Sequence, residues 1–87
     1  MKTIVYAITD PMGLHARPAG LLVKKAASFQ SNITVKNVGT GKTVDAKRIM
    51  GVMSLGVKQG NEIELSIEGE DEETAQEALS VFLKENL

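Results

Sequence analysis

The sequence predicts an α+β domain in which helices cover one face of an antiparallel sheet, in the order β-α-β-β-α-β-α. Residues 62–68 alternate between polar and apolar side chains, as in a strand of a sheet with one solvent-exposed face. Residues 16–29 and 70–84 instead repeat their apolar positions at helical spacing. A length of 87 residues suits one domain with a modest core, and we expect it to comprise residues 1–87.

A strand, a turn and a helix are expected in the first third of the chain. Residues 3–8 alternate as a strand does, and the turn-forming run Asp10-Pro11-Met12-Gly13 ends it. A helix then follows over residues 16–29, with Pro18 in its first turn, where the missing N–H costs little. Five apolar residues of this helix are expected to face the core: Ala19, Leu22, Val23, Ala26 and Ala27.

The middle of the chain predicts a hairpin and a short helix. Residues 33–38 and 42–44 have the composition of paired strands, joined through Gly39-Thr40-Gly41. Asp45 is then placed to cap a helix over residues 46–53. A glycine inside that helix weakens it, so we expect a short or irregular turn of helix.

The last third predicts a strand and an amphipathic helix. The turn Gln59-Gly60-Asn61 precedes the strand at 62–68. Its inward residues are expected to be Ile63, Leu65 and Ile67. The final helix, at 70–84, has acidic residues at its positive end and Lys84 near its negative end, as the helix dipole favours. Its core residues are expected to be Ala75, Ala78, Leu79 and Phe82.

The composition excludes several classes of function. Ten basic and eleven acidic side chains give a formal charge of −1, and aromatic residues are few, so we do not expect nucleic-acid binding. The chain has no cysteine, and no cluster of residues suits a metal, so no cofactor is expected. No targeting signal and no apolar run of about 20 residues, which a bilayer span requires, is found. We expect a cytoplasmic protein without membrane insertion.

The single histidine, His15, lies in the run Gly13-Leu14-His15-Ala16-Arg17-Pro18-Ala19. A helix start has backbone N–H groups without partners and a dipole that favours anions. Because neutral imidazole is nucleophilic near neutral pH, His15 could take a phosphoryl group there. The N–H groups of Ala16 and Arg17, with the Arg17 guanidinium, would bind its oxygens. The alternatives are a capping or solvated histidine and an ordinary surface arginine.

The chain lacks the parts of a self-contained enzyme. No carboxylate is adjacent to His15, the nearest in sequence being Asp10, and no glycine-rich phosphate loop of the Walker type is present. We therefore expect a phosphoryl-carrier protein, not an enzyme, that acts only with partner phosphotransferases.

Two sequence blocks give the chain a resemblance to a known family. They are Gly13-Leu14-His15-Ala16-Arg17-Pro18-Ala19 and Ile49-Met50-Gly51-Val52-Met53-Ser54-Leu55-Gly56. The chain resembles the histidine-containing phosphocarriers (HPr) of the bacterial phosphoenolpyruvate-dependent sugar phosphotransferase system. The resemblance implies an open-faced β-sandwich with a four-stranded antiparallel sheet and three helices on one face. It implies that His15 accepts a phosphoryl group on Nδ1 from phosphorylated enzyme I and passes it to IIA domains of sugar permeases, with Arg17 stabilising it.

The resemblance also implies a docking surface around the first helix and the short helix. We expect it to consist of Leu21, Lys24, Lys25, Arg48, Met50, Met53 and Leu55. Methionine suits a surface that serves several partners, whereas the alternative for Met50 and Met53 is core packing. A monomer is expected, because a permanent interface would bury this surface.

Arg48 marks a departure from the family. In HPr proteins of many Gram-positive bacteria a serine that an ATP-dependent kinase phosphorylates precedes the Ile-Met-Gly run, and here that position is Arg48. A phosphoserine would add negative charge beside the docking surface, whereas Arg48 keeps a positive charge there. We hypothesise that the chain lacks this switch and the co-repressor role that depends on it.

Two alternative functions stay open from the sequence. An HPr-like carrier could serve a regulatory or nitrogen-related relay or a dihydroxyacetone-kinase system, because the chemistry of His15 would be the same. A non-catalytic regulatory binding module would keep the fold, although it would not need both His15 and Arg17.

Overall fold

The computed structural model describes all 87 residues, which form four strands and three helices. In chain order these are β1 (Lys2–Ala7), α1 (Ala16–Ala27), β2 (Asn32–Asn37), β3 (Thr43–Asp45), α2 (Ile49–Met53), β4 (Glu62–Glu68) and α3 (Glu72–Asn86). The predicted order β-α-β-β-α-β-α and the predicted fold class are confirmed.

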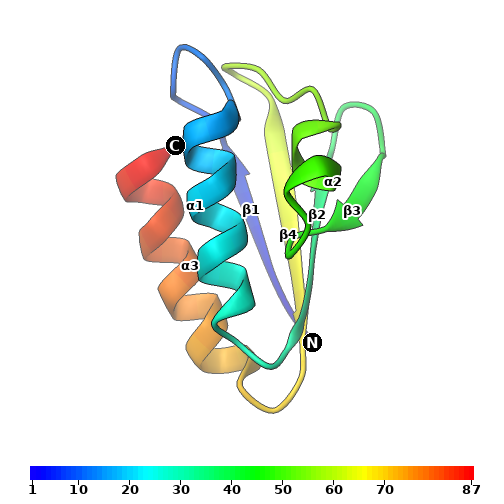
Figure 1. Cartoon of the computed structure of the whole chain (residues 1–87), viewed down its shortest axis with the longest axis vertical. Coiled ribbons are helices and arrows are strands. Elements are labelled where there is room, and N and C mark those ends of the chain that lie inside the picture. Colours follow the sequence, from blue (N-terminus) through cyan, green and yellow to red (C-terminus); the bar gives the residue numbers. More distant parts are fainter.

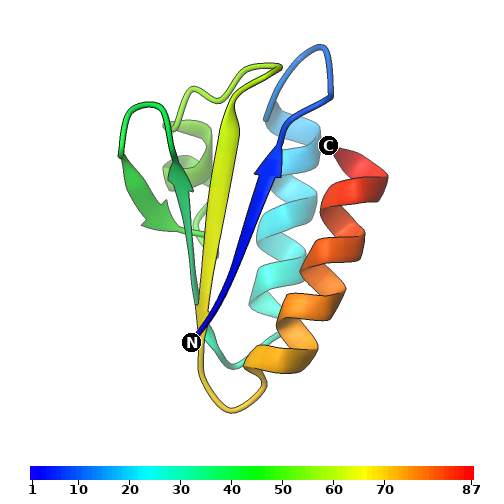
Figure 2. The ribbon, with the colours of Figure 1, turned by 180° about the vertical axis from the view of Figure 1, so that it is seen from behind.

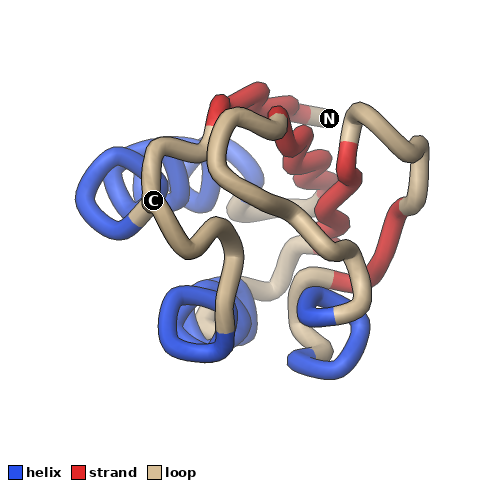
Figure 3. The backbone as a smooth tube through the Cα atoms, turned by 90° about the horizontal axis from the view of Figure 1, so that it is seen from above, coloured by secondary structure: helices blue, strands red, loops and turns tan.

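The strands form one antiparallel sheet in the order β1-β4-β2-β3. The last strand of the chain, β4, therefore lies between β1 and β2, while β1 and β3 form the edges. All three helices lie on one face of this sheet, and the other face is uncovered (Figures 1 and 2). Seen from above, α1 lies between α3 and α2, and it packs against both of them (Figure 3).

The core lies between the sheet and the helices, and the apolar side chains of β4, which alternate with polar ones, point into it. Ile63, Leu65 and Ile67 are fully buried, whereas Glu62 and Glu68 at the ends of the strand are exposed. This confirms the predicted inward and outward faces, which follow from the period of two in a strand. Nineteen buried hydrophobic residues form one contiguous cluster.

Helix α1 is shorter than predicted. It ends at Ala27 rather than at residue 29, because Ser28 forms the C-cap and its hydroxyl donates to the carbonyl oxygen of Lys25 at 2.6 Å. The prediction that Ala27 faces the core is wrong, since Ala27 is exposed. Val23 is half-buried and packs against the core, as predicted. The buried stripe consists of Pro18, Ala19, Leu22 and Ala26.

Helix α2 begins three residues later than predicted, and Asp45 is not its cap. Asp45 is the last residue of β3 and pairs with Thr34, and the N–H of Ala46, in the turn that follows, donates to the Ile33 carbonyl at 2.9 Å. The Asp45 carboxylate accepts the N–H of Lys47 at 2.9 Å in a turn that precedes the helix. The N-cap position therefore falls to Arg48.

Helix α3 is displaced along the sequence relative to the prediction. It spans Glu72–Asn86 instead of 70–84, with Asp71 at the N-cap position. Ala75, Leu79 and Phe82 are buried as predicted, but Ala78 is only half-buried, and Leu83 completes the buried stripe. No helix in the chain combines the length and the apolar character that a membrane crossing requires.

Candidate functional site

His15 occupies the N-cap position of α1. Its backbone is extended (φ −88°, ψ −178°), and its carbonyl oxygen accepts the N–H of Ala19 at 2.9 Å in the first turn of the helix. The imidazole makes no capping hydrogen bond, and it is half-buried. The ring therefore lies at the helix start without forming a capping hydrogen bond, so its nitrogens do not bond to the helix backbone and one of them can act as a nucleophile.

The first turn of α1 offers two unpaired backbone donors. The N–H groups of Ala16 and Arg17 donate to no backbone or side-chain acceptor, and Pro18 has no N–H. No acidic residue lies in this turn, so no side chain of the turn itself neutralises the positive end of the helix dipole. This combination favours an anion next to His15.

The loop before His15, residues 8–14, forms backbone hydrogen bonds with two segments that are distant in sequence. At one end, the N–H groups of Thr9 and Asp10 donate to the carbonyl oxygen of Leu87 at 2.6 and 3.0 Å. At the other end, the N–H of Leu14 donates to the carbonyl oxygen of Val57 at 3.1 Å. The loop is therefore anchored before the ring on the C-terminal segment and on the segment that leads into β4.

His15 opens onto a surface pocket of about 250 Å³ beside the end of α3. Its lining residues are Asp10, His15, Arg17, Pro18, Leu21, Glu85 and Asn86. Arg17 is exposed and makes no ion pair with a carboxylate, so its guanidinium is free to bind a further anion in the pocket. The sequence analysis placed His15 and Arg17 in the same site. Glu85 and Asn86 come from the other end of the chain, and no sequence pattern indicated that they would line this pocket.

A carboxylate lies beside the imidazole after all. Asp10 Oδ2 is 3.5 Å from His15 Nε2, which corrects the expectation that His15 has no neighbouring carboxylate. That expectation was wrong because it measured proximity along the chain, and the turn at residues 11–13 folds Asp10 back onto the ring. The signal that could have found Asp10 is the run Asp10-Pro11-Met12-Gly13 itself, because Asp at the start of such a turn directs its side chain locally.

Six of the seven residues of the expected docking surface are exposed. Leu21 on α1 and Met50 and Met53 on α2 present apolar side chains on adjacent helices, and Met50 is 79% exposed. The exposed basic residues are Lys24 and Lys25 in the last turn of α1 and Arg48 before α2.

The assignment of Leu55 to the docking surface is wrong, because this side chain is 4% exposed and belongs to the core. The chain turns inward after α2 ends, and the buried Asn37 amide donates to the Leu55 carbonyl at 3.0 Å. Sequence reasoning also missed two exposed apolar residues. Met12 is 71% exposed in the loop before His15, and Ile49 is exposed at the start of α2.

No group of three or more side chains is arranged to hold a metal ion. The polar groups at the site are the imidazole of His15, the guanidinium of Arg17, the carboxylates of Asp10 and Glu85 and the free N–H groups of the first turn of α1.

Comparison with known proteins identifies the family of this chain. A family model described as the HPr component phosphorylation site of the phosphotransferase system (PTS) matches residues 2–85. The chain belongs to this HPr family. HPr of Lysinibacillus sphaericus, a phosphocarrier protein, is 48% identical over 85 residues, which cover 98% of this chain and 94% of that protein.

Solved HPr structures share the fold. A crystal structure of HPr from Thermoanaerobacter tengcongensis superposes with a TM-score of 0.91 at 49% identity, covering 99% of this chain and 94% of that one. A second structure from the same bacterium, described as an HPr dimer, covers 98% and 95% with a TM-score of 0.75 at 49% identity. The chain is accordingly a phosphocarrier of the phosphotransferase system.

Proposed function

We propose that His15 carries the phosphoryl group, which it accepts on Nδ1 from phosphorylated enzyme I and passes to IIA domains of sugar permeases. The observation that supports this most directly is the position of the imidazole, half-buried at the start of α1 beside two unpaired N–H groups and an unpaired guanidinium. No other side chain in the protein combines a nucleophilic nitrogen with an anion site.

The transfer itself needs the His15 imidazole, the donors of the first turn of α1 and a phosphorylated partner. The Nδ1 lone pair of His15 attacks phosphorus, the P–N bond forms, and the bond from phosphorus to the donor breaks. The N–H groups of Ala16 and Arg17 and the Arg17 guanidinium then receive the phosphoryl oxygens. Because these donors are at the surface, the stabilisation stays modest, which suits a group that must be handed on.

The proposed docking surface consists of the exposed residues Leu21, Lys24, Lys25, Arg48, Met50 and Met53. It lies over α1 and α2, beside the pocket that His15 and Arg17 line. Its lysines are unpaired, so the surface is attractive to acidic patches on partner proteins and should speed their association. The chain would act as a monomer in the cytoplasm, without catalysing a reaction alone.

The proposal is tested by intact-protein mass spectrometry at neutral to alkaline pH after incubation with enzyme I and phosphoenolpyruvate. We expect a gain of one phosphoryl group that disappears in acid and is absent from the His15→Ala protein. Transfer onward is read by adding a IIA domain, which should return the chain to its original mass. A folded wild-type chain that gains no mass, or a His15→Ala chain that gains the same mass, would refute the proposal.

A further inference from the structure

Asp10 is held at three of its four polar groups. Its N–H donates to the Leu87 carbonyl at 3.0 Å, and its own carbonyl oxygen accepts the N–H of Gly13 at 2.9 Å. Its side-chain oxygen Oδ1 accepts the N–H of Met12 at 2.9 Å. These bonds fix the backbone of Asp10 and orient its carboxylate, and they leave one oxygen atom, Oδ2, without a backbone partner.

That remaining oxygen faces His15. Oδ2 lies 3.5 Å from Nε2, and both side chains are about three-quarters buried, with 25% of Asp10 and 29% of His15 exposed. Arg17 and Glu85 line the same pocket, but neither forms an ion pair with the imidazole. Asp10 is therefore the charged group placed to act on this ring.

We propose that Asp10 is a positioning residue that selects the tautomer of His15. A carboxylate only accepts hydrogen bonds, so it favours the imidazole with its proton on Nε2. Nδ1 then keeps its lone pair and can act as the nucleophile. This inference rests on the proposed function of His15 as the phosphoryl carrier.

The same contact assists the transfer step. When Nδ1 bonds to phosphorus and the donor's bond to phosphorus breaks, Nε2 keeps its proton and the ring becomes positively charged. The carboxylate of Asp10 lies next to that charge and stabilises it, as the buried aspartate does for the histidine of a serine-protease triad. Since the present contact is longer and partly exposed to solvent, its effect on rate will be much smaller than in a triad.

The anchoring bond to Met12 makes Asp10→Asn an informative variant. An asparagine can keep that bond only with its amide oxygen in the position of Oδ1, because the N–H of Met12 needs an acceptor. Its NH₂ group then faces Nε2 of His15. Since an NH₂ donates, it favours the tautomer with the proton on Nδ1, which blocks the nucleophile. Asp10→Asn should therefore be more harmful than Asp10→Ala, which removes the carboxylate and leaves both tautomers open.

The test has two readouts on the same proteins. The first is the ¹⁵N chemical shift of the two ring nitrogens of neutral His15, which reports the tautomer without any phosphoryl transfer. We expect the Nε2–H form in the wild type, a mixture in Asp10→Ala, and a shift toward Nδ1–H in Asp10→Asn. The second is the initial rate of phosphoryl transfer from enzyme I. Asp10→Ala should lower it by about three- to tenfold, because one partly buried polar contact with the ring is lost, and Asp10→Asn should lower it by more.

Asp45→Asn is the matched control. The Asp45 carboxylate accepts the N–H two residues ahead at 2.9 Å, as the Asp10 carboxylate does, but Asp45 is the last residue of β3 and does not line the pocket of His15. It should leave the tautomer and the rate unchanged. If Asp10→Asn fails to fold, Asp10→Ser replaces it, because a hydroxyl can accept the Met12 N–H while removing the carboxylate from the ring.

The outcomes separate this inference from the proposed function. Equal tautomer populations and equal rates in the wild type and the Asp10 variants would overturn the role of Asp10 while leaving His15 as the carrier. A wild-type chain that accepts no phosphoryl group would overturn the proposed function, and the ring-nitrogen shifts would still decide whether Asp10 selects the tautomer.

Discussion

Gly13 decides how closely the loop before His15 can approach the rest of the protein. Its φ of +67° lies in the left-handed region, which a residue with a Cβ adopts at a cost. A Cβ at this position would also lie 2.4 Å from the Val57 carbonyl oxygen and 2.7 Å from the Lys58 Cα, so the backbone would have to move. The loop geometry that holds Asp10 and His15 therefore depends on this glycine.

We predict that Gly13→Ala lowers the free energy of unfolding by about 1–3 kcal/mol and slows phosphoryl transfer. The cost comes from the strained φ and from the displaced contact with residues 57 and 58. Urea denaturation measures the first effect. The control is Gly20→Ala on α1, where nothing lies within 4 Å of the added methyl group, and which should instead stabilise by about 0.5–1 kcal/mol. A neutral Gly13→Ala would mean that the loop tolerates a different path.

Arg48 carries the second prediction at this scale. Its side chain is exposed just before α2, and its one ionic contact is long, with 3.9 Å between Arg48 Nε and Asp45 Oδ2. The guanidinium therefore adds positive charge to the proposed docking surface. We predict that incubation with ATP and a kinase specific for the serine of other HPr proteins produces no phosphoserine. An Arg48→Ser protein serves as the comparison, because it restores a hydroxyl before the Ile-Met-Gly run. Phosphoserine on the unaltered chain would contradict the idea that the switch is missing.

At the scale of elements, α2 and the residues after it have an exposed side, which is proposed to dock partners, and a buried side, which packs in the core. Met50 projects from the exposed side of the helix, whereas Val52 and Leu55 enter the core on the other side. The helix is five residues long, and its C-cap Ser54 closes the last turn with bonds to Gly51. A short element therefore leaves the apolar side chains of Met50 and Met53 exposed, as the proposed docking surface requires, while Val52 and Leu55 pack in the core.

Two alanine substitutions test this separation. Leu55→Ala should lower the free energy of unfolding by about 2–5 kcal/mol, because it removes buried methyl groups and leaves a cavity. Met50→Ala should change stability by no more than about 0.5 kcal/mol, because its side chain is in solvent. Titration with enzyme I should show weaker binding for Met50→Ala alone, provided that Leu55→Ala is measured below its unfolding temperature. Wild-type affinity in Met50→Ala would remove this residue from the docking surface.

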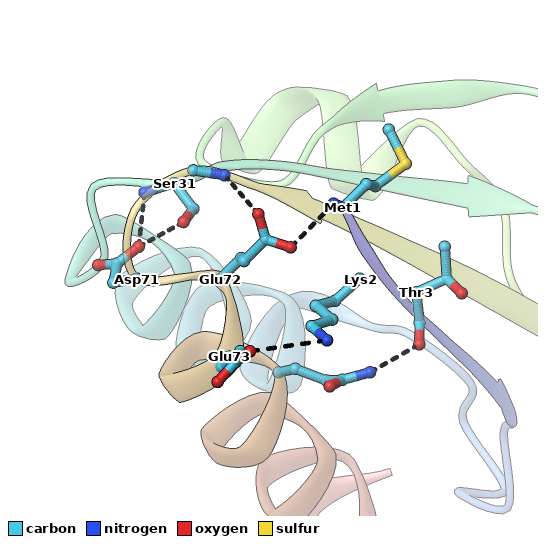
Figure 4. A network of polar contacts seen from close by, with 9 residues as sticks. Met1, Lys2, Thr3, Ser31, Asp71, Glu72 and Glu73 are labelled. Carbon is cyan, nitrogen blue, oxygen red and sulfur yellow. Dashed lines mark hydrogen bonds and ion pairs between the residues drawn. The ribbon is translucent and has the colours of Figure 1, made fainter.

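For the whole molecule, a cluster of polar contacts joins three elements at the end opposite His15 (Figures 1 and 4). The Asp71 carboxylate accepts hydrogen bonds from the Ser31 hydroxyl and from the N–H groups of Gln30 and Ser31 before β2. Next to it, Glu72 pairs with the amino group of Met1 at 2.9 Å. These contacts tie the start of α3 to the residues that directly precede β1 and β2.

The cluster predicts how stability depends on pH. The hydrogen bond from the Ser31 hydroxyl, together with those from the backbone, holds the pKa of Asp71 below its ordinary value of 3.8. A carboxyl group with a lowered pKa in the folded state stabilises the protein fully above its unfolded pKa. That contribution is lost as the pH falls through the lower folded pKa. The wild type should therefore lose stability below about pH 4.

Comparison of urea denaturation at pH 7 and pH 3 tests this. The loss of stability on acidification should be smaller in Asp71→Asn than in the wild type, because the asparagine does not titrate. Glu73→Gln is the control, since Glu73 is exposed and its contact with Lys2 is 3.9 Å long. An identical pH dependence in the wild type and Asp71→Asn would show that Asp71 does not contribute to acid sensitivity.

The fold could be predicted from the sequence because the patterns that indicate strands and helices involve residues close together in the chain. The alternation at 62–68 reports a half-buried strand, and the buried spacing of Ala19, Leu22 and Ala26 reports a helix face, since both periods follow from backbone geometry. Helix boundaries were less accurate. Asp45 was expected to cap a helix, but it is the last residue of β3, because its backbone pairs with Thr34 of β2. Helix α3 begins two residues later than predicted, after Asp71, whose carboxylate bonds to Gln30 and Ser31 before β2.

The candidate site divides in the same way. His15 and Arg17 are two residues apart at a helix start, so the sequence was enough to propose an anion site with a nucleophile in it. The contact of Asp10 with the imidazole, the arrival of Glu85 at the pocket and the burial of Leu55 depend on how distant segments fold onto one another. Periodicity and motif spacing describe neighbours along the chain, whereas these contacts are made by the packing of α3, the 57–61 segment and the loop before α1, which no local pattern encodes.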